Sequence, residues 1–337
     1  MEVPTQRMKN ILKIIGFTAG VLFILWVLSW FFDGTKWLEK GYIADRDVRI
    51  AGIDAEIPGQ IDVLNVGDSL CNASMTPMEL YRDYGYTAYN MGRDLQKPLE
   101  SLFCIRKATK KQQVKVILWE AHNLVRDDGA IDFANMLISE YFKYKVPFIK
   151  YHYIWKNWLE GPGIRKYFKG YMVNEEFKPY RGGPNYWYLD KEVHQIQKRQ
   201  KLLFKLALDY CRKNNIQLVM YSGISAYSYD MRIHNAIVQI AEEYDVEYLD
   251  ANYDKGKISI DWSHDSFDGG DHMNLFGCQK MTRYLGNYLA DECGLTDHRG
   301  DPAYRNWDDL LPAYEQELKD MEGTSYPTIE KTMGKSK

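Results

Sequence analysis

An apolar run of 22 residues near the N-terminus, Ile11–Phe32, constrains this chain more than any other feature of its sequence. The run holds a single charge, Lys13, and as a helix it would extend about 33 Å, enough to cross a hydrocarbon core of about 30 Å. A cleaved signal peptide would have a shorter apolar region and a small-residue cleavage site. Here the run ends in Trp30-Phe31-Phe32, as an interfacial aromatic belt would. We therefore predict an uncleaved signal anchor over residues 11–32.

The charges that flank this run predict its orientation. Arg7, Lys9 and Lys13 lie on its N-terminal side, whereas acidic and basic residues nearly cancel just after Phe32. By the positive-inside rule, residues 1–10 are cytoplasmic and the rest of the chain is extracytoplasmic. The sequence thus predicts a single-pass protein of the cell membrane, with the bilayer itself as one partner.

Composition excludes several other classes of protein. Of the 337 residues, 45% are hydrophobic and 26% are charged, which is close to an average soluble domain and unlike a polytopic membrane protein. The net charge of −3 gives no basic footprint for nucleic acid. The five cysteines have no C-x-x-C spacing, so we expect no structural metal site, and no cofactor is expected.

Apolar runs bounded by turn residues alternate with helical patterns after residue 60. This alternation predicts a three-layer α/β/α domain with a mostly parallel sheet over residues 61–297. Residues 33–60 would be a juxtamembrane linker, and residues 298–337 a polar C-terminal tail. The expected strands are Ile61–Val66, Thr87–Met91, Val114–Trp119, Ile216–Tyr221 and Val246–Leu249, and the expected helices are 76–84, 98–112, 190–213, 230–244 and 275–293.

One segment, residues 131–188, interrupts this rhythm. It interleaves aromatic residues with lysines and arginines, and we predict a helical insertion. Such an insertion could be a lid or groove wall over the sheet edge that grips an anionic or sugar acceptor. The alternative is a solvated basic helix whose aromatic stripe faces the core.

Two short motifs carry the candidate chemistry. Gly67-Asp68-Ser69-Leu70 follows the first strand, which places Ser69 at the carboxyl end of the sheet, where ligands bind in parallel α/β domains. Residues 268–274, Asp-Gly-Gly-Asp-His-Met-Asn, stand just before the last helix and offer His272 as a base. A serine needs a base to accept its proton, and the base needs a carboxylate to hold its tautomer.

The pair of motifs, together with this topology, resembles the SGNH (GDSL) hydrolase superfamily. The resemblance implies a flavodoxin-like SGNH fold and a serine nucleophile at Ser69. It also implies an oxyanion hole made by the backbone N–H groups of Ser69 and Gly92 and by the Asn123 amide, with His122 as the alternative to Asn123. Gly92 follows the second strand, and Asn123 follows the third.

The acid of the triad is open in the sequence. The superfamily's last block is D-x-x-H, but the residue three before His272 is Gly269. The acid is therefore Asp268, four residues before, or Asp271, directly adjacent. We favour Asp268, because the Gly-Gly pair could fold the extra residue into a tight turn.

The overall layout resembles membrane-anchored envelope acylation proteins such as the D-alanyl-lipoteichoic-acid transfer protein D. That resemblance implies a serine acyl esterase or O-acyltransferase that acts on a cell-envelope glycopolymer, such as teichoic acid, beside a membrane-bound O-acyltransferase. The competing interpretation is a non-catalytic SGNH-like domain that binds glycan or docks a membrane enzyme, which the irregular last block favours.

Overall fold

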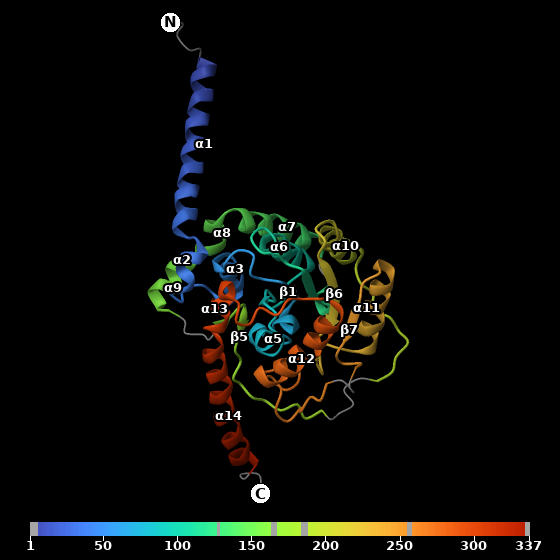
Figure 1. Cartoon of the computed structure of the whole chain (residues 1–337). Helices are drawn as coiled ribbons and strands as arrows, with labels where there is room; N and C mark the ends of the chain where they lie inside the picture. Colours follow the sequence, from blue (N-terminus) through green and yellow to red (C-terminus); the bar gives the residue numbers. More distant parts are fainter. Residues whose placement is uncertain (1–5, 127–128, 163–166, 183–187, 255–257, 334–337) are drawn as a thin grey trace. The chain divides into compact units, whose positions relative to one another are not determined.

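The computed structural model describes residues 6–126, 129–162, 167–182, 188–254 and 258–333 (Figure 1). The chain divides into two compact units. The first comprises Met1–Ala51 and Asp128–Ile164, and the second comprises Gly52–Asp127 and Arg165–Lys337.

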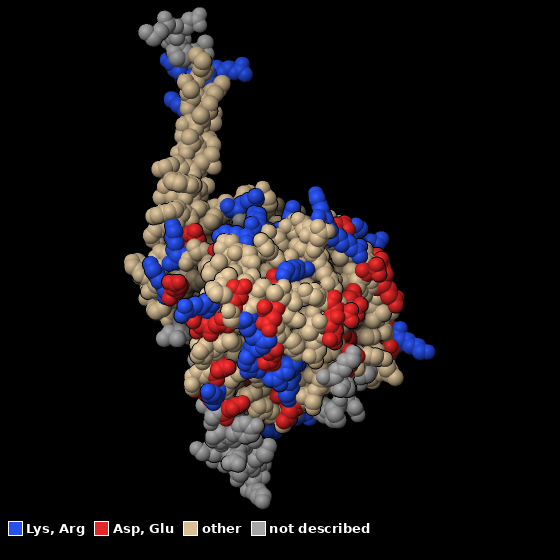
Figure 2. All heavy atoms as spheres, viewed as in Figure 1, with Lys and Arg blue, Asp and Glu red and all other residues tan. Residues whose placement is uncertain are grey.

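The first unit contains the predicted anchor as a continuous helix, α1 (Gln6–Phe31). This helix is long and apolar enough to cross a membrane, and none of its residues is buried. Its long middle stretch shows no charged side chain in Figure 2. At its C-terminal end, Lys36 Nζ donates to the Trp30 carbonyl at 2.6 Å and Trp37 Nε1 donates to the Phe31 carbonyl at 2.8 Å, which satisfies two carbonyls that the helix leaves open.

Short helices make up the rest of the first unit. Around a small core of Ile43, Ala51, Tyr151 and Ile154, apolar side chains from both parts of the unit pack together. The predicted linker is therefore largely helical. The helices are α2 (Gly34–Leu38), α3 (Asp45–Ala55, which crosses the boundary between the units), α7 (Ala130–Lys145), α8 (Pro147–Tyr151) and α9 (Ile154–Glu160).

The second unit is built on a five-stranded parallel sheet in the order β2-β1-β3-β6-β7. The central strands are buried along nearly their whole length, as apolar runs without alternation require. The predicted α/β fold class is confirmed. The strands are β1 (Val63–Val66), β2 (Ala88–Asn90), β3 (Val116–Glu120), β6 (Gln217–Ser222) and β7 (Tyr248–Asp250).

The helices of this unit form two groups. α6 (Pro98–Ala108), α10 (Lys198–Lys213) and α11 (Met231–Tyr244) lie side by side, and α5 (Pro77–Tyr84) packs against α12 (Leu275–Glu292). Right-handed crossovers place the two groups on opposite faces of the sheet, which gives the three layers. The prediction for α10 was wrong at its start, because residues 190–197 are not helical.

Two further segments differ from the sequence prediction. After α9, the described part of the insertion is not helical and includes a small hairpin, β4 (Tyr167–Phe168) with β5 (Tyr171–Met172). The polar C-terminal segment folds onto the second unit as η2 (Pro302–Tyr304), α13 (Arg305–Asp308) and α14 (Leu311–Met333). Trp307 and Tyr314 of this segment are fully buried.

Candidate active site

The nucleophile loop is set by a close approach of two neighbouring strands. Gly67 follows β1, and a Cβ atom at this position would lie 2.6 Å from Cβ of Glu120, at the end of β3. A glycine is therefore needed here. Asp68 then caps the short helix α4 (Ser69–Asn72) by accepting the Leu70 N–H at 3.0 Å. Ser69 is thereby held at the carboxyl end of β1.

The histidine loop is a tight turn organised by one carboxylate. Gly269 and Gly270 have φ values of +92° and +117°, a region that favours glycine. Asp268 Oδ1 accepts the N–H groups of Asp271 and His272 at 3.0 and 2.9 Å. The Gly-Gly pair thus folds the extra residue into the turn, as the sequence suggests, and leaves the second oxygen of Asp268 for the imidazole.

The two loops meet above the sheet and bring a serine, a histidine and an aspartate together. Ser69 Oγ lies 2.8 Å from His272 Nε2, and Asp268 Oδ2 lies 2.6 Å from His272 Nδ1. Asp271 Oδ2 is further from the same nitrogen, at 3.6 Å, and Asp271 Oδ1 accepts the Ser225 hydroxyl at 2.7 Å. This is the geometry of a serine–histidine–acid triad with Asp268 as the acid.

The charges around His272 favour its protonated form. Burial lowers the pKa of the imidazole, but its hydrogen bond to the Asp268 carboxylate and the negative charge of Asp271 outweigh burial and raise that pKa above 6.5. Burial raises the pKa of Asp268, but its bonds to His272 outweigh burial and lower that pKa below 3.8. Asp268 is therefore ionised at neutral pH, ready to stabilise an imidazolium.

A second histidine is tied to the nucleophile loop. Asp68 is fully buried, and its Oδ2 lies 2.8 Å from His122 Nδ1 and 3.0 Å from Arg126 Nε. Burial raises the pKa of Asp68, but the bonds and charges of these two partners outweigh it and lower that pKa. An ionised Asp68 fixes the proton of His122 on Nδ1. Nε2 of this partly exposed ring is then the nitrogen on the side away from Asp68.

A buried carboxyl group completes this network. Glu120 ends β3 and is fully buried, and both of its carboxyl oxygens lie 3.2 Å from the His122 N–H. Burial and the nearby charge of Asp68 raise the pKa of Glu120 well above its ordinary value. The same environment that raises this pKa favours the protonated carboxyl, which can donate a hydrogen bond to Asp68.

Two of the predicted oxyanion donors hold hydrogen bonds to other groups in the structure. The N–H of Gly92 donates to Asn90 Oδ1 at 2.9 Å. The Asn123 side chain is fully buried, accepts from Trp119 Nε1 at 3.0 Å and donates to Ser101 Oγ at 3.1 Å. Both groups thus hold core hydrogen bonds. His122, the alternative named from the sequence, is the neighbour that remains partly exposed.

Three of these side chains also lie close enough together to suggest a metal. Among the described residues, ligand atoms of Asp268, Asp271 and His272 fall within 4.8 Å of one another. Both nitrogens of His272 are at hydrogen-bond distance from Ser69 and Asp268, however. These contacts by themselves explain why the three side chains lie together.

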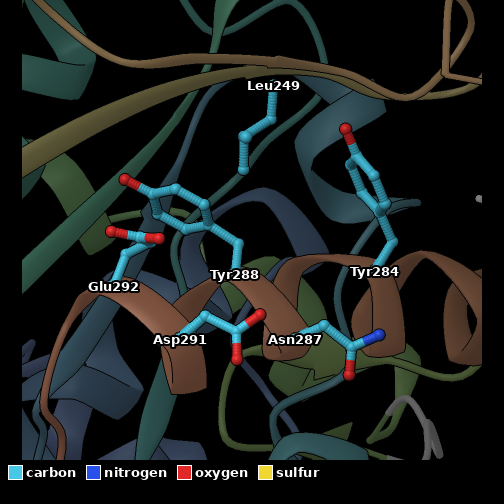
Figure 3. Close-up of a pocket in the computed structure, with 6 residues that line it drawn as sticks. All are labelled: Leu249, Tyr284, Asn287, Tyr288, Asp291 and Glu292. Carbon is cyan, nitrogen blue, oxygen red and sulfur yellow. The ribbon is translucent and has the colours of Figure 1, made fainter.

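Arg126, Ser225 and Glu120 are site neighbours that the sequence analysis missed. None of them stands in a recognisable motif, and each reaches the site only through a tertiary contact. A hollow of about 270 Å³ lies elsewhere, lined by residues of α12 and by Leu249 of β7 (Figure 3). It contains none of the triad residues, so we assign it no role. It is lined by Leu249, Tyr284, Asn287, Tyr288, Asp291 and Glu292.

Comparisons with known proteins found similar chains among solved structures. No protein-family model and no curated protein matches the chain. Among solved structures, a protein of Bacteroides fragilis assigned as an acylhydrolase is similar, with 13% identity, a TM-score of 0.37 and coverage of 72% of this chain and 95% of its own. A GDSL-like lipase of Bacteroides thetaiotaomicron has 10% identity, a TM-score of 0.38 and coverage of 73% and 97%. At these identities neither match defines a reaction for this chain.

Proposed function

We propose that this chain is a membrane-anchored serine esterase of the SGNH type. The observation that carries the proposal is the line of contacts from Ser69 Oγ through His272 to Asp268, at 2.8 and 2.6 Å. Ser69 Oγ would attack an ester carbonyl while its proton passes to His272 Nε2. The imidazolium would return that proton to the leaving alcohol, and the acyl group would stay on Ser69.

The acyl-enzyme then has two fates. With water as acceptor the protein is an esterase, and with a sugar or polymer hydroxyl it is an O-acyltransferase. In both, the oxyanion needs donors, and we propose the Ser69 N–H, at the first turn of α4, and His122 in its protonated form. The proposal replaces Gly92 and Asn123, whose polar groups are engaged elsewhere.

We further propose an envelope glycopolymer as the acceptor and a membrane-bound O-acyltransferase as the partner. The support is α1, which can tie the enzyme to a membrane, and the basic residues before it, which favour an extracytoplasmic domain. Replacing Ser69 by alanine in cells should then abolish one envelope acyl modification without lowering the abundance of the protein. Unchanged envelope acylation would favour the non-catalytic docking role.

A fluorophosphonate probe tests the nucleophile directly. The full-length protein in detergent should be labelled on Ser69, and the Ser69→Ala variant should not. Ser225→Ala is the matched control, because this serine is buried and contacts Asp271 instead of the imidazole. Labelling that persists in Ser69→Ala, or is absent from the parent protein, would exclude the esterase.

A further inference from the structure

The exposed face of α7 is apolar. Leu137, Ile138, Tyr141 and Phe142 are between 43% and 59% exposed, and their spacing places them on one side of the helix. A helix whose outer face meets water normally carries polar residues there. This face of α7 is instead typical of a surface that another apolar material covers.

The helix α9 repeats the pattern. Trp155, Trp158 and Leu159 are 49%, 63% and 74% exposed and lie one turn apart, whereas Ile154 is buried. Lys156 Nζ sits 5.6 Å from the centre of the Trp155 ring. Exposed tryptophans with lysines beside them are typical of helices that lie in a membrane interface.

Both helices are connected to the end of the membrane-spanning helix. In the same unit, the Phe148 N–H at the start of α8 donates to Ser29 Oγ at 3.4 Å, and the Phe148 ring lies 5.5 Å from the ring of Phe32. Ser29 lies in the last turn of α1, and Phe32 directly follows that helix. The start of α8 therefore lies at the level where α1 leaves the hydrocarbon core.

We propose that α7–α9 lie in the interfacial layer of the bilayer that α1 crosses, with their exposed apolar faces among the acyl chains. The lysines at the edges of these faces, Lys145 and Lys156, then meet lipid phosphates. This makes the first unit a membrane-bound platform with one spanning and several interfacial helices. The inference depends on α1 being inserted and is independent of the reaction at Ser69.

Nitroxide labels on the full-length protein test this placement. The parent carries Cys293→Ser, because Cys293 is the one cysteine that is not buried. Single cysteines replace Ile138 on α7 and Leu159 on α9, with Phe23 in α1 as the membrane reference. Leu206, 47% exposed on α10 of the other unit, is the aqueous reference. The protein is reconstituted in vesicles of phosphatidylcholine with about one third phosphatidylglycerol.

Collision rates with oxygen and with a water-soluble nickel chelate give the depth of each label. We expect labels at positions 138 and 159 to collide more often with oxygen than with the chelate, as a label at position 23 should. The label at position 206 should collide more often with the chelate. Chelate access at 138 and 159 equal to that at 206 would overturn the proposal. So would exclusion of both reagents, because that result means that a protein surface covers these helices. If a labelled variant unfolds at a lower temperature than the parent, the variants Tyr141→Cys and Trp158→Cys replace it, because they place labels on the same two faces.

Discussion

Asp268 approaches Nδ1 of His272 to 2.6 Å and also binds the His272 backbone N–H at 2.9 Å, so one carboxylate fixes both the loop and the imidazole. Asp268→Asn should therefore reduce kcat by a factor on the order of 10⁴, as loss of the tautomer-holding acid does in other triads. Asp271→Asn should stay within about tenfold of the parent. Hydrolysis of a short-chain aryl ester measures both. If Asp271→Asn loses most of its activity while Asp268→Asn is nearly normal, Asp271 and not Asp268 is the acid of the triad.

The raised pKa of His272 predicts the pH dependence of the reaction. The base must be neutral to accept the Ser69 proton, and an imidazole with a raised pKa stays charged to higher pH. The acid limb of kcat/KM should therefore lie above pH 6.5. Asp271→Asn removes a negative charge near His272, so it should lower the pKa and move this limb to lower pH by about one unit or less. A limb that does not move, or moves upward, would contradict the electrostatic role of Asp271.

We predict that the Asn123 side chain stabilises the fold and does not bind the oxyanion. Asn123→Ala leaves the buried Trp119 Nε1 without its acceptor, which should cost about 1–3 kcal/mol of unfolding free energy. Its kcat, measured on folded protein, should change only a few-fold. A genuine oxyanion donor would instead cost about 10²–10³ in kcat with little loss of stability. Denaturant unfolding alongside ester hydrolysis separates the two results. His122→Ala should show the second pattern.

Glu120 should make folding stability depend on pH. The pKa of this carboxyl group is raised well above 4.5 in the folded state, whereas in the unfolded chain it returns to that ordinary value. The folded state then binds more protons, so the free energy of unfolding falls as the pH rises above that value. Glu120→Gln keeps an acceptor and a donor without an ionisable proton. Its stability should fall less than that of the parent between pH 5 and pH 8, as thermal unfolding across this range measures. An identical slope in both proteins would show that Glu120 is ionised when folded.

The C-terminal segment should be required for folding. His298 Nε2 lies 2.8 Å from the buried Asp62 Oδ2, and Tyr314 donates to Glu79, which is fully buried on α5, at 3.1 Å. Truncation after residue 297 removes the hydrogen-bond partners of both carboxylates. It also leaves a cavity in the space that Trp307 fills. We expect the truncated protein to be insoluble or to melt well below the parent. A truncated protein that keeps the parent midpoint and accepts the Ser69 probe would show that residues 298–337 are a dispensable tail.

The strands could be predicted closely because buried parallel strands are short apolar runs, and glycines follow some of them here. Gly67 follows β1 and Gly92 closely follows β2, and the observed strands lie within the predicted runs or differ from them by one or two residues. The start of α10 could not be found in this way. Residues 190–197 have helix-compatible composition, but they hold contacts in the described structure, such as His194 Nε2 with the Val125 carbonyl at 3.2 Å, that no local pattern encodes.

Two motifs were enough to predict that Ser69, His272 and Asp268 lie together, but not to predict the hydrogen bonds of the proposed oxyanion donors. A position after a strand does not reveal where an amide points, and Asn123 points to partners in the core. The packing of the C-terminal segment did leave a signal. Trp307, Tyr314 and Met321 are all buried and stand seven residues apart, a helical period that the polar composition conceals.

The long separation of Ser69 and His272, 203 residues along the chain, has a consequence for biosynthesis. A ribosome delivers the serine early, with β1, and the histidine only after β7 has been made. A nascent chain therefore carries a hydroxyl with no base until most of the polypeptide has been synthesised and β6 and β7 have joined the sheet. Under the proposed mechanism, the chain would be inert toward acyl esters throughout synthesis and would gain reactivity only when these two loops come together.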